Sequence, residues 1–421
     1  METDTTQQQV QESIDSADLV VCILAEFDSD SIAKVYESLR ALPGSLRIAV
    51  MENDQRESPA PATSEAAGKR ASAETAQKNA AVFHVSSPST KPEGSTARVP
   101  RTSAAYQSVF AMAEKLQARG CCIVASKLET VTPGWIWQLA QPLLEGEADL
   151  VLPRYARRKF EGLLNNGVIA PLMRALYGKR VNNPMGPDCA ISQRLIQTML
   201  ESMASRNDNR RHPLASLTST ALCENLQVTV VHFEARIYPP ADWTGMSSVL
   251  ADILSPVFLD MERNAACWQR TRVSAAVRAI GEPRNVAEDT AVPDTRRMIE
   301  SLQLGNRELQ EIWGLVLPPS TLFDLRKLAV LPVEQFRMSD ELWVRIVYDF
   351  ALAHRLRTIS RDHLLRSMTP LYLGWVASYA HDLKVSGAAS PEQRLERLSL
   401  AYEASKSYLV SRWRWPDRFN P

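Results

Sequence analysis

The chain has 421 residues, which is long enough for one large domain followed by a helical region. Basic and acidic residues each total 48, so no net charge favours a nucleic-acid partner. No apolar run has the length of a membrane span, and the polar N-terminus lacks the pattern of a secretory signal peptide. We therefore expect a cytoplasmic protein with no transmembrane segment and no nucleic-acid partner.

The N-terminal part of the chain has the pattern of an α/β domain. Residues 1–16 are polar and are expected to form a disordered tail. Residues 18–24 predict a buried strand, and residues 32–42 carry apolar side chains at helical spacing. Residues 46–51 predict a second strand. This strand–helix–strand order is typical of a mononucleotide-binding half-fold.

A change of composition follows. Residues 54–79 are dense in small and charged side chains and nearly lack large apolar ones, so a disordered insertion is expected. Residues 81–85 predict a strand, and residues 86–102 a second loose loop. A tolerated surface insertion is the simpler interpretation, and a segment that docks a partner is the alternative.

The central segment contains the expected binding edge. Residues 105–119 predict an amphipathic helix, and residues 121–124 predict a strand covered on both faces. Ligands of α/β sheets gather at the carboxyl ends of strands. Ala125, Ser126 and Lys127 follow this strand directly, so we expect them at the mouth of a binding cleft.

The second half of the chain turns from mixed to wholly helical. Strands are predicted at residues 148–153 and 228–231, and a basic segment follows the first of them. Helices are then predicted almost without interruption, at residues 246–272, 295–317, 340–357, 361–382 and 391–413.

Several segments resemble glycosyltransferases of the GT-A fold, of the mannosylglycerate synthase and glucosyl-3-phosphoglycerate synthase type, including bacterial family-2-like cell-wall enzymes. The basic segment 154–166 after its strand carries the likeness most clearly. Residues 183–188 (Asn-Pro-Met-Gly-Pro-Asp) are similar to the family's Gln-Pro-x-Gly-Gly-Asp loop. The resemblance implies a Rossmann-like nucleotide-sugar domain over residues 17–243 and an α-helical region over 244–421, with a possible dimer interface.

The departures from the family fall on its metal and donor motifs. The family carries Asp-x-Asp where this chain has Ala125, Ser126 and Lys127, and carboxylates there hold Mg²⁺ or Mn²⁺. A methyl group has no lone pair and an ammonium repels a cation, so no metal cofactor is expected. Four further family features are altered. The family's entry proline corresponds to Leu24, and its Gly-Lys-Gly turn corresponds to residues 101–103. Its second loop glycine corresponds to Pro187, and a metal-binding histidine corresponds to Tyr238.

Two accounts of these departures stay open. In one, Lys127 replaces the ion at the donor diphosphate, with Arg101 and Arg154 as further donor-binding residues beside Ala125 and Ser126. In the other, the donor site has decayed, and the protein is a pseudoenzyme that acts as a scaffold or regulator, with an active paralogue as a candidate partner. Decay is the simpler account of five altered features.

The acceptor side keeps more of the family pattern. The resemblance assigns Arg157, Glu161 and Asn165 to a small carboxylate acceptor such as glycerate, with Asn165 standing where threonine is usual. A planar guanidinium suits a carboxylate through two parallel hydrogen bonds. A solvated basic loop is the alternative for these residues. Asp188 is expected either to contact a sugar or acceptor hydroxyl in catalysis or to cap a turn after Pro187.

Overall fold

The computed structural model describes residues 16–24, 29–53, 80–85, 103–125, 134–204, 212–234, 243–284, 292–385 and 390–416. By their internal contacts the residues divide into two compact units. The sheet unit comprises Met1–Arg154, Met185–Glu234 and Arg278–Glu282, and the helical unit comprises Tyr155–Pro184, Ala235–Val277 and Pro283–Pro421. The expected boundary near residue 243 stays a prediction, and the expected tail, insertion and loop before residue 103 lie almost wholly outside the described residues.

The sheet unit is built on one mostly parallel sheet. Its eight described strands lie in the order β10-β8-β5-β7-β4-β1-β2-β3. β7 is antiparallel to both of its neighbours, whereas β1, β2, β3 and β4 run parallel to one another. The strands are β1 (Leu19–Ile23), β2 (Ile48–Asn53), β3 (Ala80–Val85), β4 (Gly120–Val124), β5 (Leu150–Tyr155), β7 (Cys189–Ser192), β8 (Val228–Phe233) and β10 (Arg278–Ile280). All six strands predicted from apolar runs are present, and β7 and β10 were not predicted.

The register brings several strand ends to one edge. Ile23 of β1 pairs with Val124 of β4, so these two strands end together. β7 runs the opposite way, and its first residue, Cys189, pairs with Ile123. The start of β7 therefore lies beside the carboxyl end of β4, which runs in the opposite direction. Every residue of β1 and β4 is buried, as expected for strands covered on both faces.

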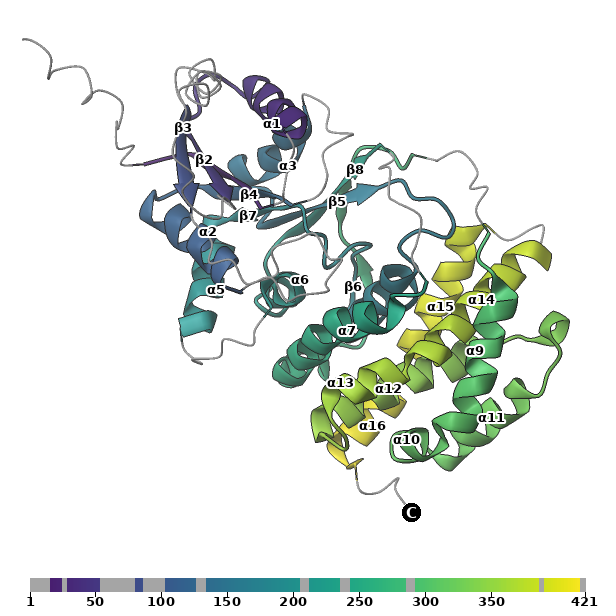
Figure 1. Cartoon of the computed structure of the whole chain (residues 1–421). Coiled ribbons are helices and arrows are strands. Elements are labelled where there is room, and N and C mark those ends of the chain that lie inside the picture. Colours follow the sequence, from purple (N-terminus) through teal and green to yellow (C-terminus); the bar gives the residue numbers. More distant parts are fainter. Residues whose placement is uncertain are drawn as a thin grey trace, which may run out of the picture. The chain divides into compact units, whose positions relative to one another are not determined.

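Helices cover both faces of this sheet. Figure 1 shows α1 (Ser29–Arg40) and α3 (Trp135–Leu144) on one face, and α2 (Ser103–Lys115) and α5 (Gln193–Ala204) on the other. The helix α6 (Pro213–Cys223) packs against α5 and β8. The α/β class predicted from the sequence is confirmed.

The helical unit also matches its prediction in class. A π-helix, Asn165–Ile169, leads into α4 (Ala170–Tyr177), and the short strands β6 (Lys179–Arg180) and β9 (Ala275–Ala276) pair in parallel. The remaining helices are α7 (Met246–Arg263), α8 (Ala265–Trp268), α9 (Thr295–Glu308), α10 (Gln310–Gly314), α11 (Pro319–Ala329), α12 (Asp340–Leu356), α13 (Arg361–Ser367), α14 (Thr369–Val385), α15 (Pro391–Ala404) and α16 (Lys406–Arg414). None of the described helices is long and apolar enough to cross a membrane.

Four of the five long predicted helices are interrupted. The predicted helix 361–382 is two helices, α13 and α14, which meet at Met368. Pro370 lies at the second position of α14, where its missing N–H is tolerated, whereas in the middle of one long helix its ring would clash with a preceding carbonyl. The predicted helices 246–272, 295–317 and 391–413 are likewise divided.

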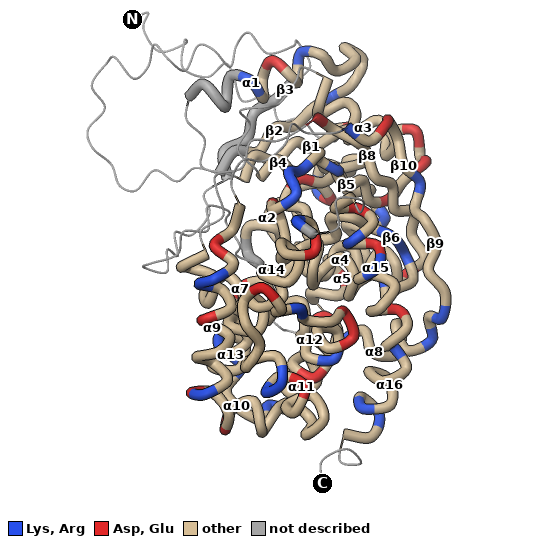
Figure 2. The backbone as a smooth tube through the Cα atoms, turned by 90° about the vertical axis from the view of Figure 1, so that its right-hand side faces the viewer, with Lys and Arg blue, Asp and Glu red and all other residues tan. Residues whose placement is uncertain are grey.

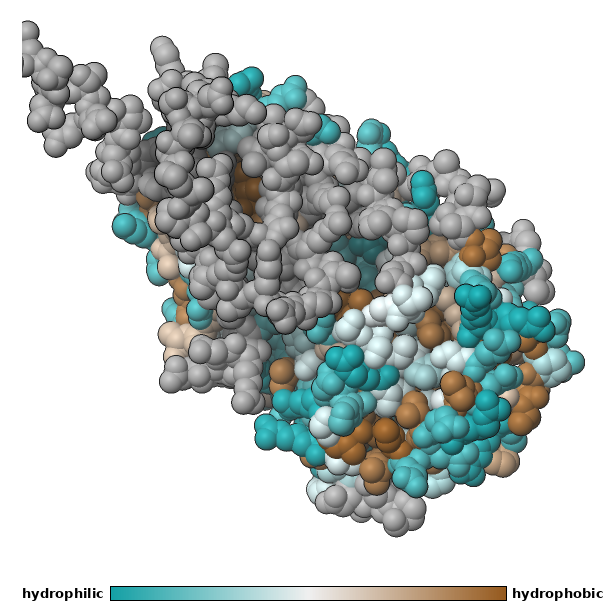
Figure 3. All heavy atoms as spheres, viewed as in Figure 1, coloured by the Kyte–Doolittle hydropathy of each residue, from teal (hydrophilic) through white to brown (hydrophobic). Residues whose placement is uncertain are grey.

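Aromatic side chains form the core of the helical unit. Trp375 lies between Trp343 and Tyr379, with ring centroids 5.7 Å away on each side and interplanar angles of 18° and 25°. Such pairs contribute about 0.5–1.5 kcal/mol each beyond the area that they bury. Figure 3 shows apolar and polar side chains interspersed on one face of this unit. Exposed apolar residues of the unit include Phe323 and Val330.

Candidate functional site

At the carboxyl edge of the sheet unit, two hydrogen bonds donated by backbone N–H groups link the strand ends. Leu24 follows β1, and its N–H donates to the carbonyl of Val124 over 2.9 Å. Ala125 follows β4, and its N–H donates to Oδ1 of Asp188 over 2.9 Å. The side chains of Leu24 and Ala125 are both buried. Ala125, the first residue of the predicted 125–127 site, thus has a buried methyl side chain.

Asp188 is brought to this edge by the register of β7, which begins at the next residue. It has no solvent exposure. Burial raises the pKa of the thiols of Cys122 and Cys189, and the nearby Asp188 carboxylate raises both further. The carboxylate accepts a hydrogen bond from the residue that follows β4, and so links the end of β4 to the start of β7.

Arg154 reaches the same edge from β5, which neighbours β8 in the sheet. The pKa of His232, in β8, is lowered first by burial and second by the positive charge of Arg154. An aromatic pair lies nearby, because Trp135 at the start of α3 contacts Phe233 at the end of β8 with ring centroids 5.7 Å apart. Among the described residues, the charge of Arg154 therefore acts on His232 near the end of β8, where Trp135 and Phe233 form an aromatic pair.

The described residues of this edge do not fit a divalent cation. Mg²⁺ and Mn²⁺ need several hard oxygen ligands, and here Ala125 has none while Asp188 binds a backbone N–H. Within the ranges that the structure describes, no group of three or more acidic, histidine or cysteine side chains has the arrangement of a metal site. Ser126, Lys127, Arg101 and Tyr238 lie outside those ranges.

The residues assigned to the acceptor lie in the helical unit, on a segment that follows β5. Nη2 of Arg157 donates to Oδ1 of Asn183 over 3.3 Å. Nδ2 of Asn165 donates to the carbonyl of Asn182 over 2.7 Å and to Oδ1 of Asn166 over 2.9 Å. Two of the three assigned side chains therefore meet the same short stretch, residues 182–183.

Glu161 is engaged elsewhere on the segment. Its Oε2 accepts a hydrogen bond from the N–H of Arg158 over 2.9 Å, which closes a turn. Gly162 follows with a φ of +63°, and a Cβ there would overlap the guanidinium of Arg157. The left-handed backbone conformation therefore favours glycine at this position, and any larger residue would also displace the end of the Arg157 side chain.

Side chains of the C-terminal helices form hydrogen bonds with the backbone of this segment and of the π-helix that follows it. The carbonyl of Gly167 accepts hydrogen bonds from Nε1 of Trp343 over 2.9 Å and from the hydroxyl of Tyr402 over 3.1 Å. The hydroxyl of Tyr379 donates to the carbonyl of Lys159 over 3.0 Å. Burial raises the pKa of Tyr402, so its hydroxyl stays protonated and able to donate.

Sequence reasoning missed these positioning residues. The π-helix contains Gly167 after two asparagines, and that polar break inside an apolar stretch was the only local signal. π-Helical turns are often found at functional sites. The segment thus carries Arg157, Glu161 and Asn165 on a backbone that is hydrogen-bonded to aromatic side chains of the core.

No protein-family model and no curated protein matches the chain. Among solved structures, glucosyl-3-phosphoglycerate synthase from Mycobacterium tuberculosis in complex with phosphoglyceric acid has 19% identity and a TM-score of 0.37, over 59% of this chain and 80% of that one. The same enzyme with Mn²⁺, UDP and glucosyl-3-phosphoglycerate has 16% identity and a TM-score of 0.36, over 59% and 80%. The mannosyltransferase PcManGT from Pyrobaculum calidifontis, with GDP-Man and Mn²⁺, has 12% identity and a TM-score of 0.29, over 96% and 88%.

Proposed function

We propose that the protein is a GT-A glycosyltransferase-like protein that binds a nucleoside-diphosphate sugar through basic side chains instead of a metal ion. The observation that carries this proposal is the end of β4, where a buried methyl group replaces a carboxylate and Asp188 is bound to the backbone. The edge keeps the parallel strand ends at which nucleotides bind in α/β proteins. Among the residues that the structure describes, this edge offers no cluster of oxygen ligands for a cation.

Positive charge is what the chemistry requires there. Breaking the bond between the sugar and the diphosphate leaves negative charge on the departing diphosphate, and a fixed cation stabilises that charge. Arg154 lies at the edge and influences His232 electrostatically. Lys127 follows Ala125 by two residues and supplies the second cation in this proposal.

The acceptor in this proposal is a small hydroxy acid, such as glycerate or phosphoglycerate. Arg157 binds its carboxylate, and Asn165 and Glu161 orient its hydroxyl groups. The support is that Arg157 and Asn165 both meet residues 182–183 on a segment anchored by buried aromatic side chains. A guanidinium held in this way is pre-organised for a planar anion.

A second candidate function is a non-catalytic scaffold or regulator, acting as a homodimer or with an active paralogue. It is favoured by the internal engagement of the polar side chains, because Asp188 binds Ala125 and Glu161 binds Arg158. A role in stabilising the fold is enough to explain why these side chains are present, and no catalytic role is needed.

Calorimetry separates the two functions. UDP-glucose and GDP-mannose are titrated into the protein with EDTA and then with Mn²⁺, and the metal-free enzyme is expected to bind one of them equally under both conditions. Lys127→Ala should abolish that binding, whereas Lys115→Ala, an exposed lysine of α2, should not change it. Binding that requires Mn²⁺ would refute the metal-free site, and no binding in either condition would support the scaffold.

A further inference from the structure

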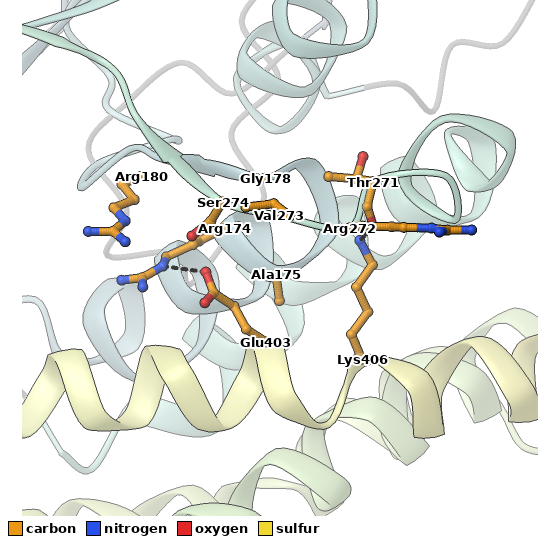
Figure 4. A pocket seen from close by; sticks show the side chains of 10 residues that line it. All are labelled: Arg174, Ala175, Gly178, Arg180, Thr271, Arg272, Val273, Ser274, Glu403 and Lys406. Atoms are coloured by element: carbon orange, nitrogen blue, oxygen red, sulfur yellow. Dashed lines mark hydrogen bonds and ion pairs between the residues drawn. The ribbon is translucent and has the colours of Figure 1, made fainter.

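The helical unit contains a polar pocket that belongs neither to the sheet edge nor to the 157–165 segment. Its volume is about 290 Å³, and its lining includes Arg174, Arg180, Arg272, Glu403 and Lys406. Figure 4 shows Arg180 at one end and Arg272 at the other, with Glu403 and Lys406 reaching up between them from α15 and the start of α16. We call this the basic pocket.

The backbone around the basic pocket is fixed by the end of α4. Gly178 ends that helix with a φ of +69°, and a Cβ there would lie 2.6 Å from the carbonyl oxygen of Val273. This close approach lets the chain continue into β6, which pairs with β9. The residues of both strands and the 271–274 stretch are thereby held over α15 and α16.

The interior of the pocket is organised by two basic side chains. Arg174 is nearly buried and binds Glu396 and Glu403, each with an N–O distance of 2.7 Å. Lys406 donates from Nζ to the carbonyls of Leu176 and Thr271, both over 2.8 Å. An ammonium has three protons, so one proton of Lys406 has no acceptor among the described residues.

The rim adds two more cations. Arg180 and Arg272 are exposed, and neither side chain forms a hydrogen bond or ion pair with any residue that the structure describes. The pKa of the Glu396 carboxyl is lowered first by its hydrogen bonds with Arg174 and also by the charge of Arg180. Figure 2 shows further basic residues along the chain around β6 and β9, and Lys179 and Arg270 are exposed members of that stretch. The pocket has four cationic side chains, and the carboxylates beside them are Glu403 and Glu396. The site therefore carries a net positive charge, which favours an anion.

We propose that the basic pocket binds the phosphate group of a small anion. Guanidinium groups match phosphate oxygens through parallel hydrogen bonds, and the ammonium of Lys406 supplies a point charge between them. Thr271 and Ser274 contribute hydroxyl groups to the same lining. This site does not depend on the proposed transfer reaction, because all of its residues lie in the helical unit.

The test uses the full chain and inorganic phosphate or pyrophosphate as probes, with ionic strength held constant by NaCl. Calorimetry is expected to show saturable binding that falls about tenfold or more in the double variant Arg180→Gln, Arg272→Gln. The matched control, Arg307→Gln with Arg326→Gln, removes two exposed arginines of α9 and α11 that do not line the pocket. It should bind as the wild type does.

Two comparisons make the result specific. Lys127→Ala removes the cation of the proposed donor site, so unchanged phosphate binding in that variant assigns the anion to the basic pocket. Cosedimentation with phosphatidylglycerol vesicles, against phosphatidylcholine vesicles, shows whether the phosphate belongs to a lipid headgroup or to a soluble anion. The proposal is overturned if the wild type binds neither probe, or if the pocket variant binds as tightly as the control.

Discussion

The carboxyl edge of the sheet unit and the 157–165 segment of the helical unit use polar residues in opposite ways. At the edge, Asp188 is fully buried and binds the backbone of a neighbouring strand. On the segment, Arg157 and Asn165 are half-buried and bind the stretch at residues 182–183. The edge is therefore held by a side chain that a ligand cannot easily recruit, whereas the segment presents side chains that a ligand can reach.

This difference bears on how a motif is interpreted. A carboxylate in a family loop is readily assigned to catalysis, but the hydrogen bond of Asp188 gives it a structural role whether or not the protein is an enzyme. The segment gains its order from elsewhere, because Trp343 and Tyr402 bind the carbonyl of Gly167. A buried alanine at the end of β4 is thus compatible with an intact backbone at both places.

The largest effect is expected for Asp188→Ala. The substitution leaves the buried N–H of Ala125 without its acceptor, and an unsatisfied buried donor costs about 1–3 kcal/mol. The free energy of unfolding, measured with urea by circular dichroism, should fall by about that amount. Glu201→Ala, an exposed position of α5, is the control and should stay within about 0.5 kcal/mol. An unchanged urea midpoint for Asp188→Ala would contradict the structural role.

The sequence predicted the elements better than the contacts between them. Buried strands such as β1 and β4 are runs of apolar residues, and such runs can be recognised locally. The hydrogen bond from the N–H of Ala125 to Asp188 spans 63 residues of the chain, and the sequence did not predict it. The two roles weighed for Asp188, contact with a sugar or acceptor hydroxyl and a cap on the turn after Pro187, stay predictions. Long-range hydrogen bonds depend on strand order, which local patterns do not contain.

The same limit applies to the segment. Arg157 and Asn165 were singled out through the resemblance, and the structure brings both to residues 182–183. Their anchoring by Trp343 and Tyr402 was not predicted, because these aromatic side chains also fit a generic apolar helix face. The roles of the singled-out residues toward a ligand stay predictions.

Acid should affect the helical unit through His354. Burial first, and then the charges of Arg361 and Arg357, lower the pKa of His354 to about 3, while Ser255 and Phe258 contact its ring. Between pH 6.5 and 3 the unfolded chain binds a proton that the folded chain does not, so stability falls as the pH falls. At pH 5 this loss amounts to about 2 kcal/mol.

The variant His354→Gln isolates this effect. Its stability should depend less on pH than that of the wild type, so that the difference between the two proteins narrows by about 2 kcal/mol between pH 7 and pH 5. Urea unfolding followed by tryptophan fluorescence at both pH values measures this difference. Parallel pH profiles for the two proteins would show that His354 is not the acid-sensitive group.

A smaller loss is expected for Gly167→Ala. A Cβ at this position would overlap the ring of Trp375, and both the glycine and the tryptophan are buried, so the π-helix or the aromatic stack must shift. Overpacking of this kind costs about 1–3 kcal/mol, and partial relaxation should keep the cost near the lower end. Gly314→Ala is the control, because a Cβ there meets nothing within 4 Å. Equal urea midpoints for the two variants would argue against tight packing at Gly167.

The smallest effect is expected for Asn165→Thr, which restores the residue usual in the resembled family. Threonine has a hydroxyl but no amide, so it cannot maintain the two hydrogen bonds to Asn182 and Asn166. The loss should be about 1 kcal/mol in the free energy of unfolding, because the site is only half-buried. If Asn165 also binds an acceptor, calorimetry with 3-phosphoglycerate should show a change in affinity beyond that of Asn166→Ala, which removes only the neighbour's amide. Equal affinities in these two variants would leave Asn165 with a purely structural role, and the acceptor assignment would then rest on Arg157 and Glu161.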